Sequence, residues 1–501
     1  LKVLYNYSGS EYLQSGNPAN KVSFTLVAPK NLDFSIKTTP GLPPVTDSAA
    51  GNNRYYQLNL HNVPALQNGD LFFYMPQLER VDFALNYAIE GKDTIRTGWQ
   101  QFGENNYIPI VAVSKQEYKQ LEKELARWPF LKRRMPETQL IYMVEQYIKT
   151  NFELTAPSET QETIDLISII RSRRAEKAGF TRLMNAVYYM LNIPTQVLFT
   201  SARDTILPDS KLTYPQLPGH VLLYFPTVQQ ALAPTEMNTR FPCYPSLWAG
   251  IPALRCRDTH VNQESKVLTD FIRTPVAPYT LSSITMDATL KSVKDAAWEV
   301  KQSFGGYPAS NIKNAFTTAG STQEGKFQVY NAILPFLPGI RKPTAIKAEN
   351  ETFSNYMLDK PVTLTSTLLT TSLVEDKGTQ ITNHLGQFLG GITPVNIPLP
   401  AGDLPVQITF PYYQEKRVTI NIPAGYKVAD KAVFSADISS KGPQPALGYK
   451  MRCEQDGSQL HIFIVEWYRQ MDFTEENKEV FRQLLSKVGA IQQQDLELVK
   501  E

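Results

Sequence analysis

The sequence predicts a multidomain α+β protein. Three observations carry this prediction: the length of the chain, its composition, and a change in the spacing of its hydrophobic residues. The chain has 501 residues, which is more than one typical domain contains. Hydrophobic residues make up 42% and charged residues 20%, as in folded globular proteins. Both ends of the chain alternate with a period of two and the middle shows helical spacing, so we expect domains over residues 1–112, 113–257 and 258–501.

The first domain, over residues 1–112, is predicted to be an antiparallel β-sandwich. Hydrophobic and polar residues alternate in "KVSFTLVAP", "LDFSIKT", "RYYQLNLHNV" and "RVDFALNYAI". Turn-rich segments such as "TPGLPPVTDSAAGNN" separate these runs, which is the pattern of short antiparallel strands. The opening run "LKVLYNYSGS" already has the character of a strand, so this domain could be truncated at its start.

The second domain, over residues 113–257, is predicted to be an α+β unit with its helices first and its strands after them. One helical stripe consists of Ile141, Val144, Tyr147 and Ile148. A later helix begins near Gly179, and its hydrophobic face is predicted to hold Phe180, Leu183, Met184, Val187 and Leu191. Two apolar runs, "TQVLFTSA" and "HVLLYFPTV", then predict two strands that are buried on at least one side.

The third domain, over residues 258–501, is predicted to be β-rich with helices. The segment "PASNIKNAFTTAGSTQEGKFQVYNAILPFL" predicts a helical insertion over about 305–336, and "DAAWEVKQSF" fits a helix or a strand equally well. Period-two alternation returns in "PVTLTSTLLTTSLVE", "PVQITFPYY", "KRVTINIPAG" and "QLHIFIVEWYRQ". A closing helix over about 474–488 begins with Glu475 and Glu476, which suit the positive end of a helix dipole.

Three segments of the middle domain resemble the core of the transglutaminase-like superfamily, which shares its fold with the papain-like cysteine peptidases. "GFTRLMNAVYYMLNIPTQVLF" is similar to the helix that follows the catalytic Cys and leads through an Ile-Pro step into a strand. "LPGHVLLYFP" resembles the strand that carries the catalytic His, and "ALAPTEMN" resembles the strand of the orienting Asp. The resemblance implies that Lys177, His220 and Ala233 stand at the Cys, His and Asp positions.

The departures from this pattern predict a catalytically inactive protein. Lys177 replaces the thiol, and Ala233 cannot orient an imidazole, so two members of a Cys-His-Asp triad are lost. His220 is then expected to be a packed structural residue. The flanking segments resemble β domains found in bacterial envelope proteins, which implies a periplasmic or otherwise extracytoplasmic location. We therefore expect a binding or scaffolding module whose partner is an unknown protein or peptide.

Several alternatives remain open at this stage. Cys243 or Cys256 could approach His220 as a displaced nucleophile, with Glu236 in place of the missing Asp, which would give a cysteine peptidase or an acyl-transfer enzyme. The same two cysteines could instead form a disulfide. Lys177 could act as a Schiff-base amine in a desolvated pocket. A cationic group ahead of the helix could bind an anion: Arg171, Arg173 and Arg174.

Composition and the absence of known motifs also argue against a nucleic-acid partner, a transmembrane segment, a cofactor and a metal site. Fifty Lys and Arg against 48 Asp and Glu give a formal net charge of +2, and no polybasic stripe is present, so nucleic acid is not an expected partner. No run of 18 apolar residues predicts a transmembrane segment, and the first residues have no signal-peptide pattern. Because no P-loop, dinucleotide fingerprint, HExxH, CxxC or G-x-S-x-G motif occurs, we expect no cofactor and no metal site.

Overall fold

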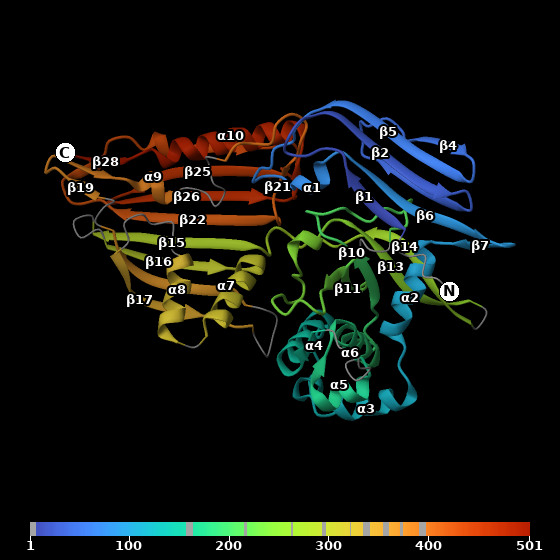
Figure 1. Cartoon of the computed structure of the whole chain (residues 1–501). Helices are drawn as coiled ribbons and strands as arrows, with labels where there is room; N and C mark the ends of the chain where they lie inside the picture. Colours follow the sequence, from blue (N-terminus) through green and yellow to red (C-terminus); the bar gives the residue numbers. More distant parts are fainter. Residues whose placement is uncertain are drawn as a thin grey trace. The chain divides into compact units, whose positions relative to one another are not determined.

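The computed structural model shows an α+β protein with several sheets, and it divides into two compact units (Figure 1). Unit 1 holds most residues up to 276, and unit 2 holds residues 70–72 with most residues from 277 onward. The described residues are 7–156, 164–214, 218–261, 264–292, 297–320, 322–333, 341–353, 360–370, 374–389 and 397–501. The multidomain α+β class is therefore confirmed, whereas the division into three domains stays a prediction.

Unit 1 begins with two antiparallel sheets. The first is made of β1 (Ser8–Tyr12), β6 (Arg80–Glu90), β3 (Leu32–Thr38) and β7 (Asp93–Arg96). The second is made of β2 (Ala19–Pro29), β5 (Asn53–Val63) and β4 (Thr46–Ala50). Side chains from both sheets meet in shared hydrophobic clusters, where Phe24 and Leu58 of the second sheet pack with Val81 of the first. A short helix, α1 (Tyr74–Gln77), precedes β6.

Residues near the end of the predicted β domain form a helix that the sequence did not predict. Helix α2 (Trp99–Val111) contributes Trp99, Phe102 and Ile110 to the same core as the later helices. Gly103 lies against β13 and β14, because a Cβ there would come within 3.0 Å of Cys256 Sγ and closer still to Thr269. Gly103 and Pro109 both weaken the helical signal in the sequence. Helical spacing therefore did not reveal this helix.

The rest of unit 1 is a helical cluster beside a five-stranded sheet. The helices are α3 (Lys115–Leu125), α4 (Glu137–Asn151), α5 (Leu166–Ser172) and α6 (Lys177–Met190). The sheet has the order β12 (Gln230–Leu232), β11 (His220–Phe225), β10 (Gln196–Thr200), β13 (Pro252–Val261) and β14 (Glu264–Arg273), all antiparallel. The predicted boundary at 257/258 falls inside β13.

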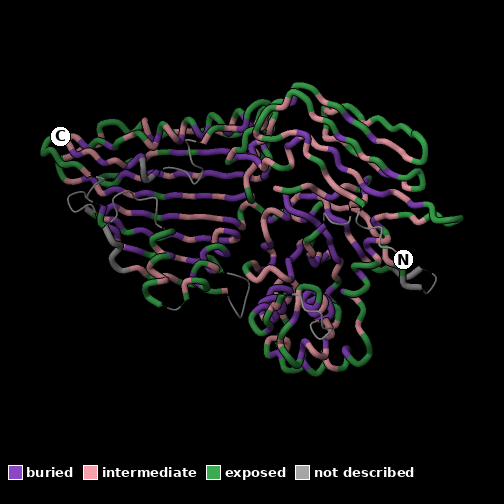
Figure 2. Tube along the Cα trace, viewed as in Figure 1, coloured by how far each residue is buried: buried purple, intermediate pink, exposed green. Residues whose placement is uncertain are grey.

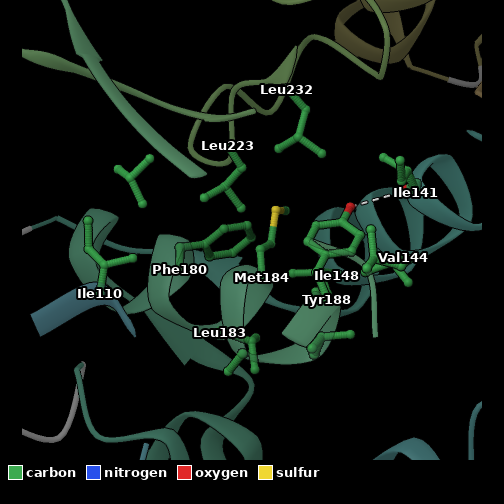
Figure 3. Packing of buried hydrophobic residues seen from close by; sticks show 14 of the residues in the cluster. Ile110, Ile141, Val144, Ile148, Phe180, Leu183, Met184, Tyr188, Leu223 and Leu232 are labelled. Carbon is green, nitrogen blue, oxygen red and sulfur yellow. Dashed lines mark hydrogen bonds between the residues drawn. The ribbon is translucent and has the colours of Figure 1, made fainter. Parts of the chain in front are cut away.

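Helix α6 is the central element of this core, as the sequence predicted. Phe180, Leu183, Met184 and Val187 have no exposed surface. Figure 3 shows Phe180, Met184 and Tyr188 pointing from α6 toward Leu223 of β11 and Leu232 of β12. The helix ends where Asn192 adopts a left-handed conformation (φ 56°), and Pro194 then blocks its continuation. The prediction for residues 177–190 and the two following strands is confirmed.

Unit 2 is built around an eight-stranded sheet whose strands are buried along one face (Figure 2). Its order is β17 (Arg341–Glu349), β18 (Val362–Leu369), β16 (Ala297–Phe304), β15 (Ser283–Ser292), β22 (Tyr412–Asn421), β26 (Gln459–Tyr468), β25 (Leu447–Asp456) and β24 (Ala436–Ser439). All neighbouring pairs are antiparallel except β15 and β22. The ambiguous segment "DAAWEVKQSF" thus contributes a strand.

The helices predicted for this region are present. The helical insertion contains α7 (Gly306–Ala319) and α8 (Gln323–Ile333), although residues 321 and 334–336 lie outside the described residues. The closing helix is α10 (Glu475–Gln492), which buries Phe481, Leu484 and Val488. Shorter elements complete the unit: β19 (Val374–Asp376), β20 (Gln380–Asn383), α9 (Leu385–Leu389), β21 (Val406–Gln407), β23 (Tyr426–Val428), β27 (Asp472–Phe473) and β28 (Leu496–Lys500). Across the described residues, no helix combines the length and hydropathy needed to cross a membrane.

Candidate functional site

Lys177 is the first residue of α6, and its side chain is exposed to solvent. The helix start has no side-chain cap from Glu176, and the Lys177 carbonyl accepts a hydrogen bond from Thr181 Oγ1 at 2.9 Å. A cation at this end of a helix opposes the helix dipole. Within the described ranges Lys177 forms no ion pair that would offset this effect.

His220 is the first residue of β11 and lies opposite Thr200 of β10. Its half-buried ring stacks on Trp248, with the ring centroids 4.0 Å apart and the planes at 17°. None of the described residues forms a hydrogen bond with the ring. Burial lowers the pKa of His220; the nearby charges of Glu236 and Asp204 oppose this shift, and the charge of Lys177 adds to it. The imidazole is therefore mainly neutral at pH 7.

Ala233 follows β12 and is fully buried. Glu236 lies in the next turn, where its N–H donates to the Ala233 carbonyl at 3.3 Å. Lys177, His220 and Glu236 are therefore close enough to interact electrostatically, and Asp204 joins them. We call these four residues and Trp248 the His220 group. The structure brings the three predicted triad positions to one region, with an amine and a methyl group where a thiol and a carboxylate are needed.

A buried lysine, which the sequence analysis missed, holds the segment that follows Ala233. Lys149 Nζ of α4 donates to the carbonyl oxygens of Ala233, Glu236 and Thr239 at 2.9, 2.7 and 3.0 Å. It also donates to Glu145 Oε1 at 2.7 Å, and both side chains are fully buried. Four acceptors thus surround the three N–H donors of the ammonium group, which offsets the cost of removing it from water.

Glu145 completes this arrangement with its second oxygen, because Oε2 accepts the N–H of Phe241 at 2.6 Å. Burial lowers the pKa of Lys149 to about 8, and the charge of Glu145 opposes that shift. We call Lys149, Glu145 and the backbone groups they bind the Lys149 network. It fixes residues 233–241 against α4. An i, i+4 Glu–Lys pair on a helix is usually a solvated surface pair, so the spacing of Glu145 and Lys149 does not predict this role.

Cys256 cannot serve as a nucleophile for His220. The register places Cys256 opposite Val197, and Val197 opposite Leu223, so these three side chains share one face of the sheet. His220 is three positions from Leu223 on the same strand, which puts it on the other face, about 10 Å along the strands and about 10 Å across them from Cys256. Burial also raises the pKa of Cys256 to about 12, so the thiol stays protonated.

Cys243 lies in a turn, where its N–H donates to the Arg240 carbonyl at 2.8 Å. It is 4% exposed and does not begin a helix. Cys243 and Cys256 are both free thiols, so the disulfide that the sequence left open is not formed. The register keeps Cys256 away from His220, and a role of Cys243 as a displaced nucleophile stays a prediction.

The three arginines of the proposed anion site are mostly engaged by carboxylates. Arg173 Nη2 lies 2.6 Å from Glu124 Oε1, and its guanidinium group covers the ring of Phe152 at 4.6 Å. Arg174 Nε lies 3.0 Å from Glu153 Oε2. Arg171 is exposed. Anion binding by this group stays a prediction. In the described part of the chain no cluster of His, Cys, Asp or Glu is arranged to hold a metal ion.

Comparisons with known proteins find a likeness in fold to a solved structure but no match in sequence. No protein-family model matches the chain, and no curated protein sequence matches it. A crystal structure of a protein from Parabacteroides distasonis, described as a "putative protease", matches with a TM-score of 0.52 and 9% identity. The match covers 99% of this chain and 76% of that chain. At this identity the likeness shows the fold alone.

A second crystal structure, described as a "putative cysteine protease" from Cytophaga hutchinsonii, matches 53% of this chain and 91% of that chain at 14% identity. Its TM-score of 0.19 is too low to carry any argument. The likeness in fold therefore rests on the Parabacteroides distasonis structure alone. Membership of the transglutaminase-like superfamily, and the loss of catalytic residues, stay predictions.

Proposed function

We propose that this chain is a non-catalytic polypeptide-binding protein that keeps the architecture of a cysteine peptidase. The observation that carries the proposal is Lys177, an exposed lysine at the first position of α6, where the resemblance expects the nucleophilic thiol. A lysine at this position supplies no thiol, so the chain lacks the nucleophile of a Cys-His-Asp triad there.

The state of the other residues supports the same conclusion. His220 has a Trp248 ring against it instead of a hydrogen-bonded partner, and Ala233 offers no carboxylate. Glu236 acts on the imidazole only through its charge. A triad works as a unit, and removing its nucleophile costs about as much as removing all three members.

The second candidate is a cysteine peptidase or acyl-transfer enzyme with a displaced nucleophile. The fold comparison favours it, but Cys256 faces away from His220 and has a raised pKa. The direct test measures hydrolysis of fluorescently labelled casein by the wild type, with and without iodoacetamide. We expect no turnover in either sample. Turnover that iodoacetamide stops, and that Cys243→Ala or Cys256→Ala also stops, would establish the second candidate.

A gain-of-thiol experiment tests whether Lys177 stands at a nucleophile position. In a Cys453→Ser background, Lys177→Cys places a thiol at the start of α6, and Ala178→Cys is the matched control one residue later. The pH dependence of alkylation reports each thiol pKa. We expect Lys177→Cys to titrate below the ordinary value of about 8.5 and to move back toward it when His220→Ala is added. Equal values for the two thiols would contradict the proposed geometry.

A further inference from the structure

A second region of unit 1 has the features of a ligand site, and it lies apart from the His220 group. A pocket with a volume of about 430 Å³ opens between one face of α4 and the segment of residues 129–135. Its wall on α4 is formed at helical spacing by Gln139, Met143, Gln146, Tyr147, Thr150 and Asn151. A volume of this size accommodates a small ligand or the end of a peptide.

The interior of the pocket is apolar and aromatic. The ring centroids of Phe130 and Tyr147 lie 5.8 Å apart. The ring of the fully buried Trp128 packs at a tilt behind Tyr147, with the centroids 4.2 Å apart, and holds the aromatic wall in place. Met135 and Met143 supply flexible side chains that adapt to different apolar groups. The lower part of the site therefore suits an apolar side chain.

The rim of the pocket is cationic. Arg133 and Arg134 are both exposed and line the opening. Neither forms an ion pair with a carboxylate in the parts of the chain that are described. Many other arginines in unit 1 do have such a partner, as Arg173 has in Glu124. None of the residues that line the pocket is acidic.

We propose that this pocket binds the C-terminal carboxylate of a peptide whose last side chain is apolar. Two adjacent guanidinium groups can each offer a pair of parallel N–H donors to a carboxylate. The apolar side chain next to that carboxylate fits between Phe130, Tyr147 and Met143. The site is separate from the proposed function at His220, and it would hold even if the chain proved to have peptidase activity.

A polar residue of the α4 wall, Gln146, is held in place independently of any ligand. Gln146 is 6% exposed, and its Oε1 accepts a hydrogen bond from Arg240 Nε at 2.6 Å. Arg240 in turn donates to the carbonyl oxygens of Met237 and Thr239, in the segment that Lys149 also holds. The pocket is thus pre-formed on rigid elements, which lowers the entropic cost of binding.

The test measures the binding of a fluorescent Gly-Gly-Gly-Phe peptide with a free C-terminal carboxylate to the full chain. The first control is the same peptide with a C-terminal amide. The second control is Gly-Gly-Gly-Gly, which keeps the carboxylate but lacks the apolar side chain. We expect saturable binding of the first peptide and at least tenfold weaker binding of the other two. No saturation up to about 1 mM peptide, a value typical of weak recognition, would overturn the proposal, as would equal binding of the amide.

The protein variants are Arg133→Gln and Arg134→Gln, with Lys132→Gln as the matched control on the same exposed segment. We expect each arginine variant to weaken binding several-fold and the lysine variant to leave it nearly unchanged. Equal losses in all three would mean non-specific attraction to a cationic surface and would overturn the site. Competition by free 3-phenylpropanoate with the same affinity as the peptide would show a small-acid site and would overturn the peptide assignment.

Discussion

Two neighbouring regions of unit 1 differ in how far their lysine side chains are buried and hydrogen-bonded. In the Lys149 network the ammonium group is fully buried and has four acceptors within 3.0 Å. In the His220 group Lys177 is exposed, and the imidazole has a ring contact but no hydrogen bond from a described residue. The Lys149 network holds residues 233–241 through buried, hydrogen-bonded groups, whereas His220 is held mainly by a ring contact. The difference teaches that the backbone after Ala233 is fixed by groups other than the residues at the predicted triad positions.

The largest effect is expected from Lys149→Met. Removing the ammonium group leaves the Glu145 carboxylate buried without its charge partner, and three carbonyl oxygens lose their donor. Breaking a buried pair from one side typically costs about 3–5 kcal/mol of unfolding free energy. Urea unfolding monitored by circular dichroism measures the loss. A change below about 1 kcal/mol, the range of exposed pairs, would remove the contrast between the two regions.

A smaller loss is expected from His220→Ala. The substitution removes the stacking contact with Trp248 and leaves a half-filled space on the sheet. The lost ring contact and the partly collapsing cavity together predict a loss of about 1–2 kcal/mol in the free energy of unfolding. The same urea experiment applies, with His220→Phe as a control that keeps a ring against Trp248. An unchanged stability in His220→Ala, combined with lost polypeptide binding, would show that the histidine has a direct functional role.

A change of opposite sign is expected from Lys177→Ala. The lysine is exposed and opposes the dipole of α6, so its removal should raise stability by about 0.3–1 kcal/mol at low salt. The gain should shrink at 0.5 M NaCl, because salt screens the interaction. Lys115, the first residue of α3, provides a control at a helix that has a complete capping box. A loss of stability in Lys177→Ala would show that the protein uses this amine structurally.

The smallest effect concerns pH. The pKa of His220 is lowered in the folded protein, so below the unfolded value of about 6.5 the unfolded chain binds the proton more readily. Stability from this group is therefore present above that pH and is lost as the pH falls through the folded pKa. The wild type should lose slightly more stability between pH 7.5 and pH 5 than His220→Asn does. An identical loss would mean that the ring titrates freely.

The sequence was informative where one element decides the structure. The residues from Phe180 to Val187 predicted a buried helix, because helical spacing acts over a few turns and leaves a direct record in the order of the residues. Likewise, the apolar run in "HVLLYFP" predicted a strand, and the strand is flanked on both sides by other strands. The expectation that Lys177, His220 and Ala233 share one region came from the resemblance to the transglutaminase-like core.

What the sequence could not provide were contacts between distant segments. Lys149 binds carbonyl groups that lie 84 to 90 positions later in the chain, and backbone acceptors have no signature in the residue types. The Trp248 ring reaches His220 through a short 3-10 helix that no periodicity reveals. Helix α2 was missed because Gly103, which allows close contact with β13, also lowers helix propensity.

The parallel pairing of β15 with β22 has a consequence for how unit 2 folds. On one side of this pair, the antiparallel neighbours follow the order β15, β16, β18, β17. On the other side, they follow the order β22, β26, β25, β24. The β15–β22 pairing places Ser283 opposite Tyr413. In the sequence, α7, α8 and several strands lie between these two residues. Contacts this distant in sequence form slowly, because the loop must close before the contacts stabilise it. During synthesis the first half-sheet must therefore wait, with the edge of β15 unpaired, until β22 emerges from the ribosome.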